Sequence, residues 1–253
     1  AAFLEGDAGI AHYELLPYMQ PLLALGKFFD LHPTASARSR ELLARWVWRG
    51  ALAGTHSGDI VSTRRVLDNI DRDEHASVQR LLADTKARPE SLPDATSRFN
   101  FGHAQTKLEV LALLHLGPKH LVTGDPVAAS DLFGTQGTGR ATVLPRIISG
   151  SRGAGLPLAD TIANRLVHPK ERLVEALRGG AVFGTFLSGQ LESHGISTQA
   201  VRALADGKHA EFLELRQAEL AMRFRRFFDS RARWGESDRP PVSALMASVM
   251  DDD

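Results

Sequence analysis

The spacing of the apolar residues is helical along nearly the whole chain. Between Tyr13 and Leu31 apolar side chains recur every three or four residues, and Pro17 and Pro21 must lie in the first turns of this helix or kink it. No stretch alternates convincingly between apolar and polar residues, as a half-buried strand does. We therefore predict an all-α protein, a predominantly helical multi-helix array, with a minor α+β alternative around residues 141–148.

The same periodicity predicts further helices, together with residues that can begin or end them. Thr34 or Ser36 can cap a helix at 36–53, and Gly117-Pro118 ends the most apolar helix, at 103–116. His115 lies in this helix and is predicted to be a hydrogen-bonded core histidine. Residues 86–101 and the glycine-rich stretch 134–156 are predicted to be irregular. The other helices are expected at residues 60–70, 74–84, 158–166, 170–177, 197–204 and 209–234, with a short one after Pro240-Pro241.

The composition excludes several kinds of chemistry. The 253 residues include 30 basic and 30 acidic side chains and no cysteine. Disulfides, thiolate metal sites and a cysteine nucleophile are therefore excluded, and a wholly basic nucleic-acid coat is disfavoured. The chain shows no initiator Met, no signal peptide and no apolar run of the roughly 20 residues that a membrane-spanning helix needs. We expect a fragment of a longer cytoplasmic protein with no membrane contact.

Short catalytic and metal-binding motifs are missing from the sequence. There is no HExxH and no His-x3-His pair, and His115 and His120 lie on either side of Gly117-Pro118, so they cannot share a helix face. The cluster Gly134–Arg140 lacks the order of a phosphate-binding loop, and no GxSxG occurs. We predict no metal site and no cofactor.

Two of the predicted helices carry arginine beside aromatic residues. Four arginines of the helix at 209–234 fall within an arc of about 100°, and three more align beside Trp46 and Trp48. Their planar guanidinium groups suit phosphates. The alternative is a solvated helix face with local acidic partners, such as Glu219. The candidate nucleic-acid-binding residues are Arg38, Arg45, Arg49, Arg216, Arg223, Arg226 and Arg233.

Several segments resemble, in order, pieces of one protein family. Leu15-Leu16-Pro17-Tyr18 leads into a helix ending at Phe28-Phe29, residues 40–49 read RELLARWVWR, and His56-Ser57-Gly58 follows. These pieces resemble the helical region after the nucleotide-handling, ParB-like domain of GmrSD-type restriction proteins, in which an LxRWFWR helix recurs. The DGQQR-like signature of that domain is absent, so the resemblance implies no nucleotide site here.

Three later segments are similar to the HNH-like C-terminal part of the same family. They match its IxNR and SHxI…FLxxR patterns and are Ile162-Ala163-Asn164-Arg165, residues 191–197 (LESHGIS) and residues 212–216 (FLELR). The resemblance implies two regions. Residues 1–133 correspond to the segment after the ParB-like domain, and residues 134–253 to a glycine-rich loop plus a degenerate HNH-like helical region.

The nuclease centre of the family resembles DHIFPR, in which a histidine general base lies beside an acidic metal ligand. The counterpart here is residues 141–146, ATVLPR, so Ala141 and Thr142 replace the aspartate and the histidine. Alanine cannot bind a metal, and threonine is no general base near neutral pH. Asn164 matches a family asparagine, but Val167-His168-Pro169-Lys170 replaces a second one. The resemblance implies a vestigial centre with no catalytic residue.

The leading hypothesis is a non-catalytic helical C-terminal module of a bacterial restriction-like or phage-defence protein. It would dock the N-terminal nucleotide-handling domain, which lies outside this chain, and contact DNA through its arginines. One alternative is an active metal-dependent HNH-type DNA endonuclease that uses Asn164, His168 and Asp160. Another is a helical scaffold that binds only protein.

Overall fold

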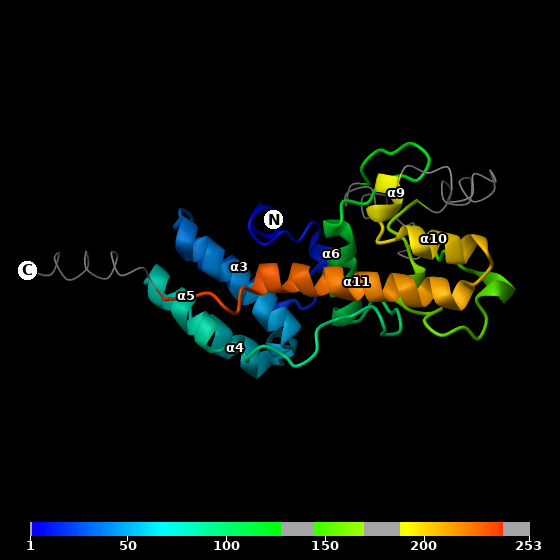
Figure 1. The fold of residues 1–253 in the computed structure, drawn as a ribbon. Helices are drawn as coiled ribbons and strands as arrows, with labels where there is room; N and C mark the ends of the chain where they lie inside the picture. The colour runs from blue at the N-terminus through cyan, green and yellow to red at the C-terminus, as the bar shows by residue number, and fades with distance from the viewer. Residues whose placement is uncertain (1, 128–143, 170–187, 240–253) are drawn as a thin grey trace, which may run out of the picture. The chain divides into compact units, whose positions relative to one another are not determined.

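The computed structural model describes residues 2–127, 144–169 and 188–239 (Figure 1). Within these residues the structure is predominantly helical, and β pairing is limited to the isolated bridges Arg98–Thr161, Lys119–Pro126 and Arg146–Arg165. The predicted all-α class is confirmed. In the described part of the stretch 141–148, the backbone forms one of these isolated bridges and does not extend into a strand.

The chain forms two compact units. The first unit comprises Ala1–Pro17 and Glu90–Ser230, and the second comprises Tyr18–Pro89 and Arg231–Asp253. The expected division between residues 133 and 134 falls among residues that the structure does not describe, and it stays a prediction.

The second unit is built on two helix pairs. α3 (Ala37–Leu52) packs on α5 (Glu74–Ala83), and α2 (Gln20–Leu31) packs on α4 (Ile60–Asp68), with a short 3-10 helix η2 (Thr55–Ser57) against α2 and α3. Side-chain caps explain where three of these helices begin. Ser36, Asp59 and Asp73 accept hydrogen bonds from backbone N–H groups in the first turns of α3, α4 and α5.

The core of the second unit includes a glycine inside a helix. Gly50 lies in α3, where the His56 ring packs directly over it, and a β-carbon at this position would overlap that ring. His56 Nε2 donates to the Trp46 carbonyl at 3.1 Å, and the two rings meet edge to face at 4.5 Å between centroids. Burial lowers the pKa of His56 to about 4, so the ring is neutral at physiological pH.

The first unit gathers helices from both ends of the chain. It contains α1 (Ala2–Gly6), η1 (Tyr13–Leu15), α6 (Ala104–His115), η4 (Gly150–Arg152), η5 (Ile162–Asn164), α9 (Ser188–Glu192), α10 (Thr198–Ala205) and residues 209–230 of α11 (His209–Ala232). α10 lies along α11 (Figure 1), and both contribute to one apolar cluster. The buried members of that cluster include Leu121, Ile147, Leu166, Leu191, Phe212 and Leu213.

Most predicted helices are confirmed within about two residues, as is usual for helix ends, but two predictions are wrong. The stretch 13–31 contains η1 and then α2, which begins at Gln20 with Pro21 in its first turn. The stretch 158–166 contains only η5, because Leu158 has a left-handed φ of 62° and the Asn164 side chain bonds to neighbouring backbone. The helices predicted at 170–177 and after Pro240-Pro241, and the cluster Gly134–Arg140, lie outside the described residues.

The prediction of a core His115 is also wrong. His115 is exposed, because it is the last residue of α6 and lies beyond the buried run Leu108–Leu113. Its ring contacts Phe227 at 4.5 Å between centroids.

Candidate nucleic-acid interface

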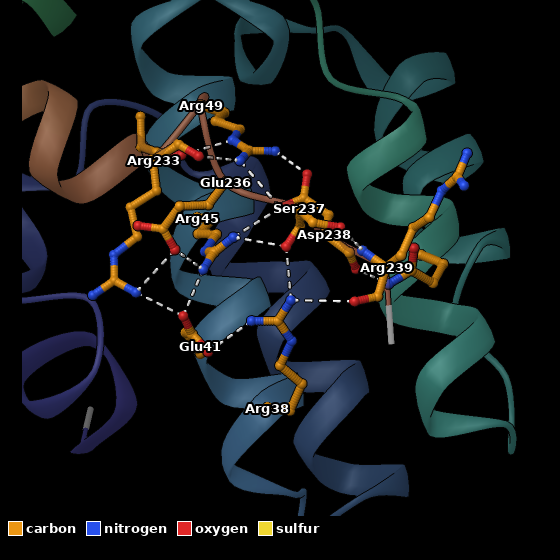
Figure 2. A network of polar contacts seen from close by, with 11 residues as sticks. Arg38, Glu41, Arg45, Arg49, Arg233, Glu236, Ser237, Asp238 and Arg239 are labelled. Atoms are coloured by element: carbon orange, nitrogen blue, oxygen red, sulfur yellow. Dashed lines mark hydrogen bonds and ion pairs between the residues drawn. The ribbon is translucent and has the colours of Figure 1, made fainter. Parts of the chain in front are cut away.

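Two of the candidate arginines of α3 are buried in an ion-pair network (Figure 2). The Arg45 side chain is 2% exposed and pairs with Glu41, Glu236 and Asp238 at 2.6, 2.5 and 3.1 Å. Arg49 also pairs with Asp238, and it donates to the carbonyls of Ala232 and Arg233 at 2.7 and 2.8 Å. These guanidinium groups hold residues 232–238 against α3, so they do not face solvent as the predicted stripe requires.

Arg38 and Arg233 form the more exposed edge of this network. Arg38 pairs with Glu41 at 2.9 Å and donates to the Ser237 carbonyl at 2.8 Å, and Arg233 pairs with Glu41 at 2.6 Å. Partial burial raises the pKa of Glu41, but hydrogen bonds from Arg45 and Arg38 hold it below its ordinary value. Each of these arginines therefore has a carboxylate partner within the second unit.

Arg216 is a fully buried arginine of α11 whose partners are carbonyl groups. Nε and Nη2 donate to the His194 carbonyl, and Nη1 donates to the carbonyls of Ala163 and Ile162. Desolvation lowers its pKa to about 9, so the group stays charged at neutral pH. Arg216 is unavailable to a phosphate in this fold, and its prediction as a surface contact is corrected.

The remaining candidates on α11 differ in their partners. Arg223 pairs with Glu219 at 2.6 Å, which confirms for this residue the alternative of a local acidic partner. Arg226 is exposed and has no hydrogen-bond or ion-pair partner among the described residues, and the same holds for its neighbour Arg225. The sequence reasoning missed Arg225 because it lies about 100° around the helix from Arg226. Of the predicted α11 stripe, Arg226 is therefore the member that is exposed without a partner among the described residues, and Arg225 lies beside it.

The residues of the alternative nuclease hypothesis are held separately by the fold. Asn164 is buried, its Oδ1 accepts from Ile148 N–H at 2.8 Å, and its Nδ2 donates to the carbonyls of Ile148 and Ala159 at 2.9 Å each. His168 Nε2 accepts from Leu121 N–H at 3.2 Å. No described contact joins these two side chains to Asp160 or to each other.

Asp160 is exposed and forms an ion pair with Arg146. Within the described residues, no three histidine, aspartate or glutamate side chains are placed to hold a metal ion. Ala141 and Thr142, the expected replacements for the nuclease pair, lie outside the described residues.

Three histidines that the sequence did not group lie together in the first unit. The rings of His120 and His168 are 5.2 Å apart, and those of His168 and His194 are 6.3 Å apart, between centroids. His194 Nε2 donates to the Lys119 carbonyl at 2.7 Å, and burial lowers the pKa of His194 to about 3. His168 Nδ1 lies 2.8 Å from the Pro169 carbonyl. The ring nitrogens of His168 and one of His194 thus bond to backbone, whereas His120 Nδ1 is buried without a hydrogen-bond partner among the described residues.

None of the helices in the described ranges is both long enough and apolar enough to span a bilayer. Comparison of the chain with protein-family models, curated proteins and solved structures finds no match.

Proposed function

We propose that this chain is a non-catalytic helical module of a bacterial restriction-like or phage-defence protein that contacts DNA. The observation that carries the proposal is the meeting of three segments at Arg216. Its hydrogen bonds link the segments 162–165, 191–197 and 212–216, which carry the resemblance to the C-terminal part of GmrSD-type proteins. The fold thus brings the three segments of the resemblance together inside the first unit.

The bonding of Asn164 and His168 supports a module without nuclease activity. To act on a substrate, Asn164 would have to give up three hydrogen bonds to buried or partly buried backbone groups, at a cost of about 1–3 kcal/mol for each unsatisfied group. His168 would have to release the Leu121 N–H. No observation in the described residues favours the nuclease alternative over the non-catalytic one.

Arg225 and Arg226 supply the proposed DNA contact on α11. Both guanidinium groups are exposed, and neither has a carboxylate partner within the described residues. Free arginines bind phosphate oxygens in pairs of hydrogen bonds and release counterions from DNA. We propose as its partner a nucleotide-handling domain that docks this module and supplies the rest of the activity.

The experiment measures affinity for a duplex DNA across a series of salt concentrations. The double variant Arg225→Gln/Arg226→Gln should weaken binding and reduce the magnitude of the log–log salt slope by about 2, because each lost phosphate contact removes about 0.9. The matched control is Arg64→Gln/Arg65→Gln, a second adjacent and exposed pair, on α4. Equal losses in both double variants, or a loss in neither, would remove the α11 contact.

A further inference from the structure

A second group of arginines lies in the first unit, around the ion pair of Arg146 and Asp160. Residues 145–147 run antiparallel to residues 164–166, with Ile147 N–H donating to the Asn164 carbonyl at 2.9 Å. This pairing places Arg146 opposite Arg165. A neighbouring segment joins them, since Phe99 N–H donates to the Asp160 carbonyl at 2.7 Å and Arg98 pairs with Thr161.

The guanidinium of Arg165 is held in a fixed plane. Its Cζ lies 3.9 Å from the centroid of the Phe99 ring, and Nη1 donates to the Leu144 carbonyl at 2.7 Å. Nε is buried without a hydrogen-bond partner, and Nη2 has no partner among the described residues. An oriented guanidinium whose Nη2 donors are unused is organised in advance for an anion.

The charges around Arg165 leave it without a carboxylate of its own. Burial first, and then the neighbouring Arg146, lower the pKa of Arg165 to about 10, while Asp160 opposes this shift. Asp160 is bonded to Arg146, whose side chain remains 45% exposed, and Arg98 beside them is exposed as well. Arg146 and Arg165 therefore share one carboxylate among the described residues, with Arg98 on the adjoining segment, and the cluster carries a positive excess.

We infer that Arg146 and Arg165 bind a phosphodiester group of a nucleic-acid backbone, with Phe99 holding the Arg165 plane and Arg98 beside the bound strand. Asp160 supplies a single carboxylate to this cluster. Two guanidinium forks can also bind the oxygens of a phosphate, which match their donors better than one carboxylate does. The choice of nucleic acid as the source of the phosphate rests on the proposed function. The site is separate from the α11 arginines and includes none of the residues that the sequence reasoning selected for nucleic-acid binding.

Asp160 provides a variant whose affinity for DNA should increase. Because its carboxylate competes with phosphate for Arg146, Asp160→Asn should tighten duplex DNA binding several-fold, as the loss of one repelling charge near a phosphate implies. Arg146→Gln should weaken binding about tenfold, the loss expected for one charge-assisted hydrogen-bonded contact. Arg202→Gln is the matched control, because Arg202 is exposed on α10 and has no ion-pair partner among the described residues.

The experiment measures binding of labelled duplex DNA by fluorescence anisotropy, and follows the Arg165 Nε–H signal by NMR with the duplex and with inorganic phosphate alone. We expect the duplex to move the Arg165 signal, with opposite changes in affinity for Asp160→Asn and Arg146→Gln and none for Arg202→Gln. Unchanged affinity in both cluster variants, while Arg225→Gln/Arg226→Gln weakens binding, would overturn this site and leave the proposed function in place. If inorganic phosphate moves the signal while the duplex does not, the assignment to nucleic acid is overturned. If the wild-type chain binds no duplex at low salt, both this site and the proposed function are overturned.

Discussion

Arg216 donates two hydrogen bonds to one atom, the carbonyl oxygen of His194, from Nε at 3.2 Å and from Nη2 at 3.1 Å. A third bond, from Nη1, reaches the carbonyl of Ala163. Among the described residues its hydrogen-bond acceptors are all carbonyl oxygens, so backbone dipoles rather than a carboxylate hold this buried charge. The arginine therefore fixes two loops against α11.

The first prediction concerns this contact. Arg216→Lys keeps the charge but replaces a planar fork by a single ammonium, which cannot reach the same carbonyls, so we expect a loss of about 2–4 kcal/mol in the free energy of unfolding. Urea denaturation measures it. The control is Arg226→Lys on the exposed side of the same helix, where a change within about 0.5 kcal/mol is expected. Equal stability of the two variants would show that the buried fork contributes nothing.

The second prediction compares two helical glycines. Gly50→Ala should destabilise the chain, because the new β-carbon overlaps the His56 ring. Gly26→Ala, in the interior of α2, meets no atom within 4 Å and should stabilise it by about 0.5–1 kcal/mol through helix propensity. Thermal melts of the two variants should therefore shift in opposite directions. A rise in the melting temperature for both would mean that His56 does not pack on Gly50.

The third prediction is a pH dependence set by Glu109 in α6. Its side chain is buried, Oε1 accepts from Ala95 N–H at 3.2 Å, and Oε2 has no hydrogen-bond partner among the described residues. Burial raises the pKa of Glu109 to about 7, from 4.5. The folded chain thus binds this proton more tightly than the unfolded chain does. The contribution of this proton to the free energy of unfolding is fully present below about pH 4.5. It is lost as the pH rises through about 7, and the loss is at most about 3 kcal/mol.

Glu109→Gln tests the pH dependence directly. The amide keeps an acceptor for Ala95 and carries no charge, so the free energy of unfolding at pH 8 should rise. The decrease of that free energy between pH 5 and pH 8 should become smaller. Glu211→Gln, at an exposed position of α11, should leave that fall unchanged. Denaturant titrations at several pH values give both slopes. Parallel curves for wild type and Glu109→Gln would contradict the prediction.

The fourth prediction concerns Asp238, which bonds to both Arg45 and Arg49. Asp238→Asn leaves two largely buried guanidinium groups with less compensating charge, so we expect a loss of about 2–3 kcal/mol in the free energy of unfolding. The loss should persist in high salt, because buried pairs are weakly screened. Asp206→Asn, whose partner Lys208 is exposed, should change stability by under about 1 kcal/mol. Similar values for the two variants would contradict a structural role for the network.

The sequence predicted helices well where a side chain marks their start. Ser36 was a candidate cap, and it accepts from Ser39 N–H at the beginning of α3. The roles of Arg216 and Asn164 could not be predicted, because their partners lie in segments distant along the chain. Helical spacing places an arginine on a face of its helix, but whether other segments cover that face depends on the tertiary fold.

The Arg146 and Arg165 cluster was hidden from the sequence for a related reason. Its members come from segments that pair through isolated bridges, which have no periodicity to detect. The available signal was the IANR segment itself, in which Arg165 follows directly after Asn164.

The central claim is that this chain binds DNA phosphates without cutting DNA. The most direct measurement follows duplex binding by the wild-type chain across a salt series, with plasmid nicking assayed under matched conditions in Mg²⁺ and in Mn²⁺. We predict affinity that falls linearly with the logarithm of the salt concentration, and no nicking with either metal. Absence of binding at low salt, or metal-dependent nicking that Asp160→Asn abolishes, would contradict the account.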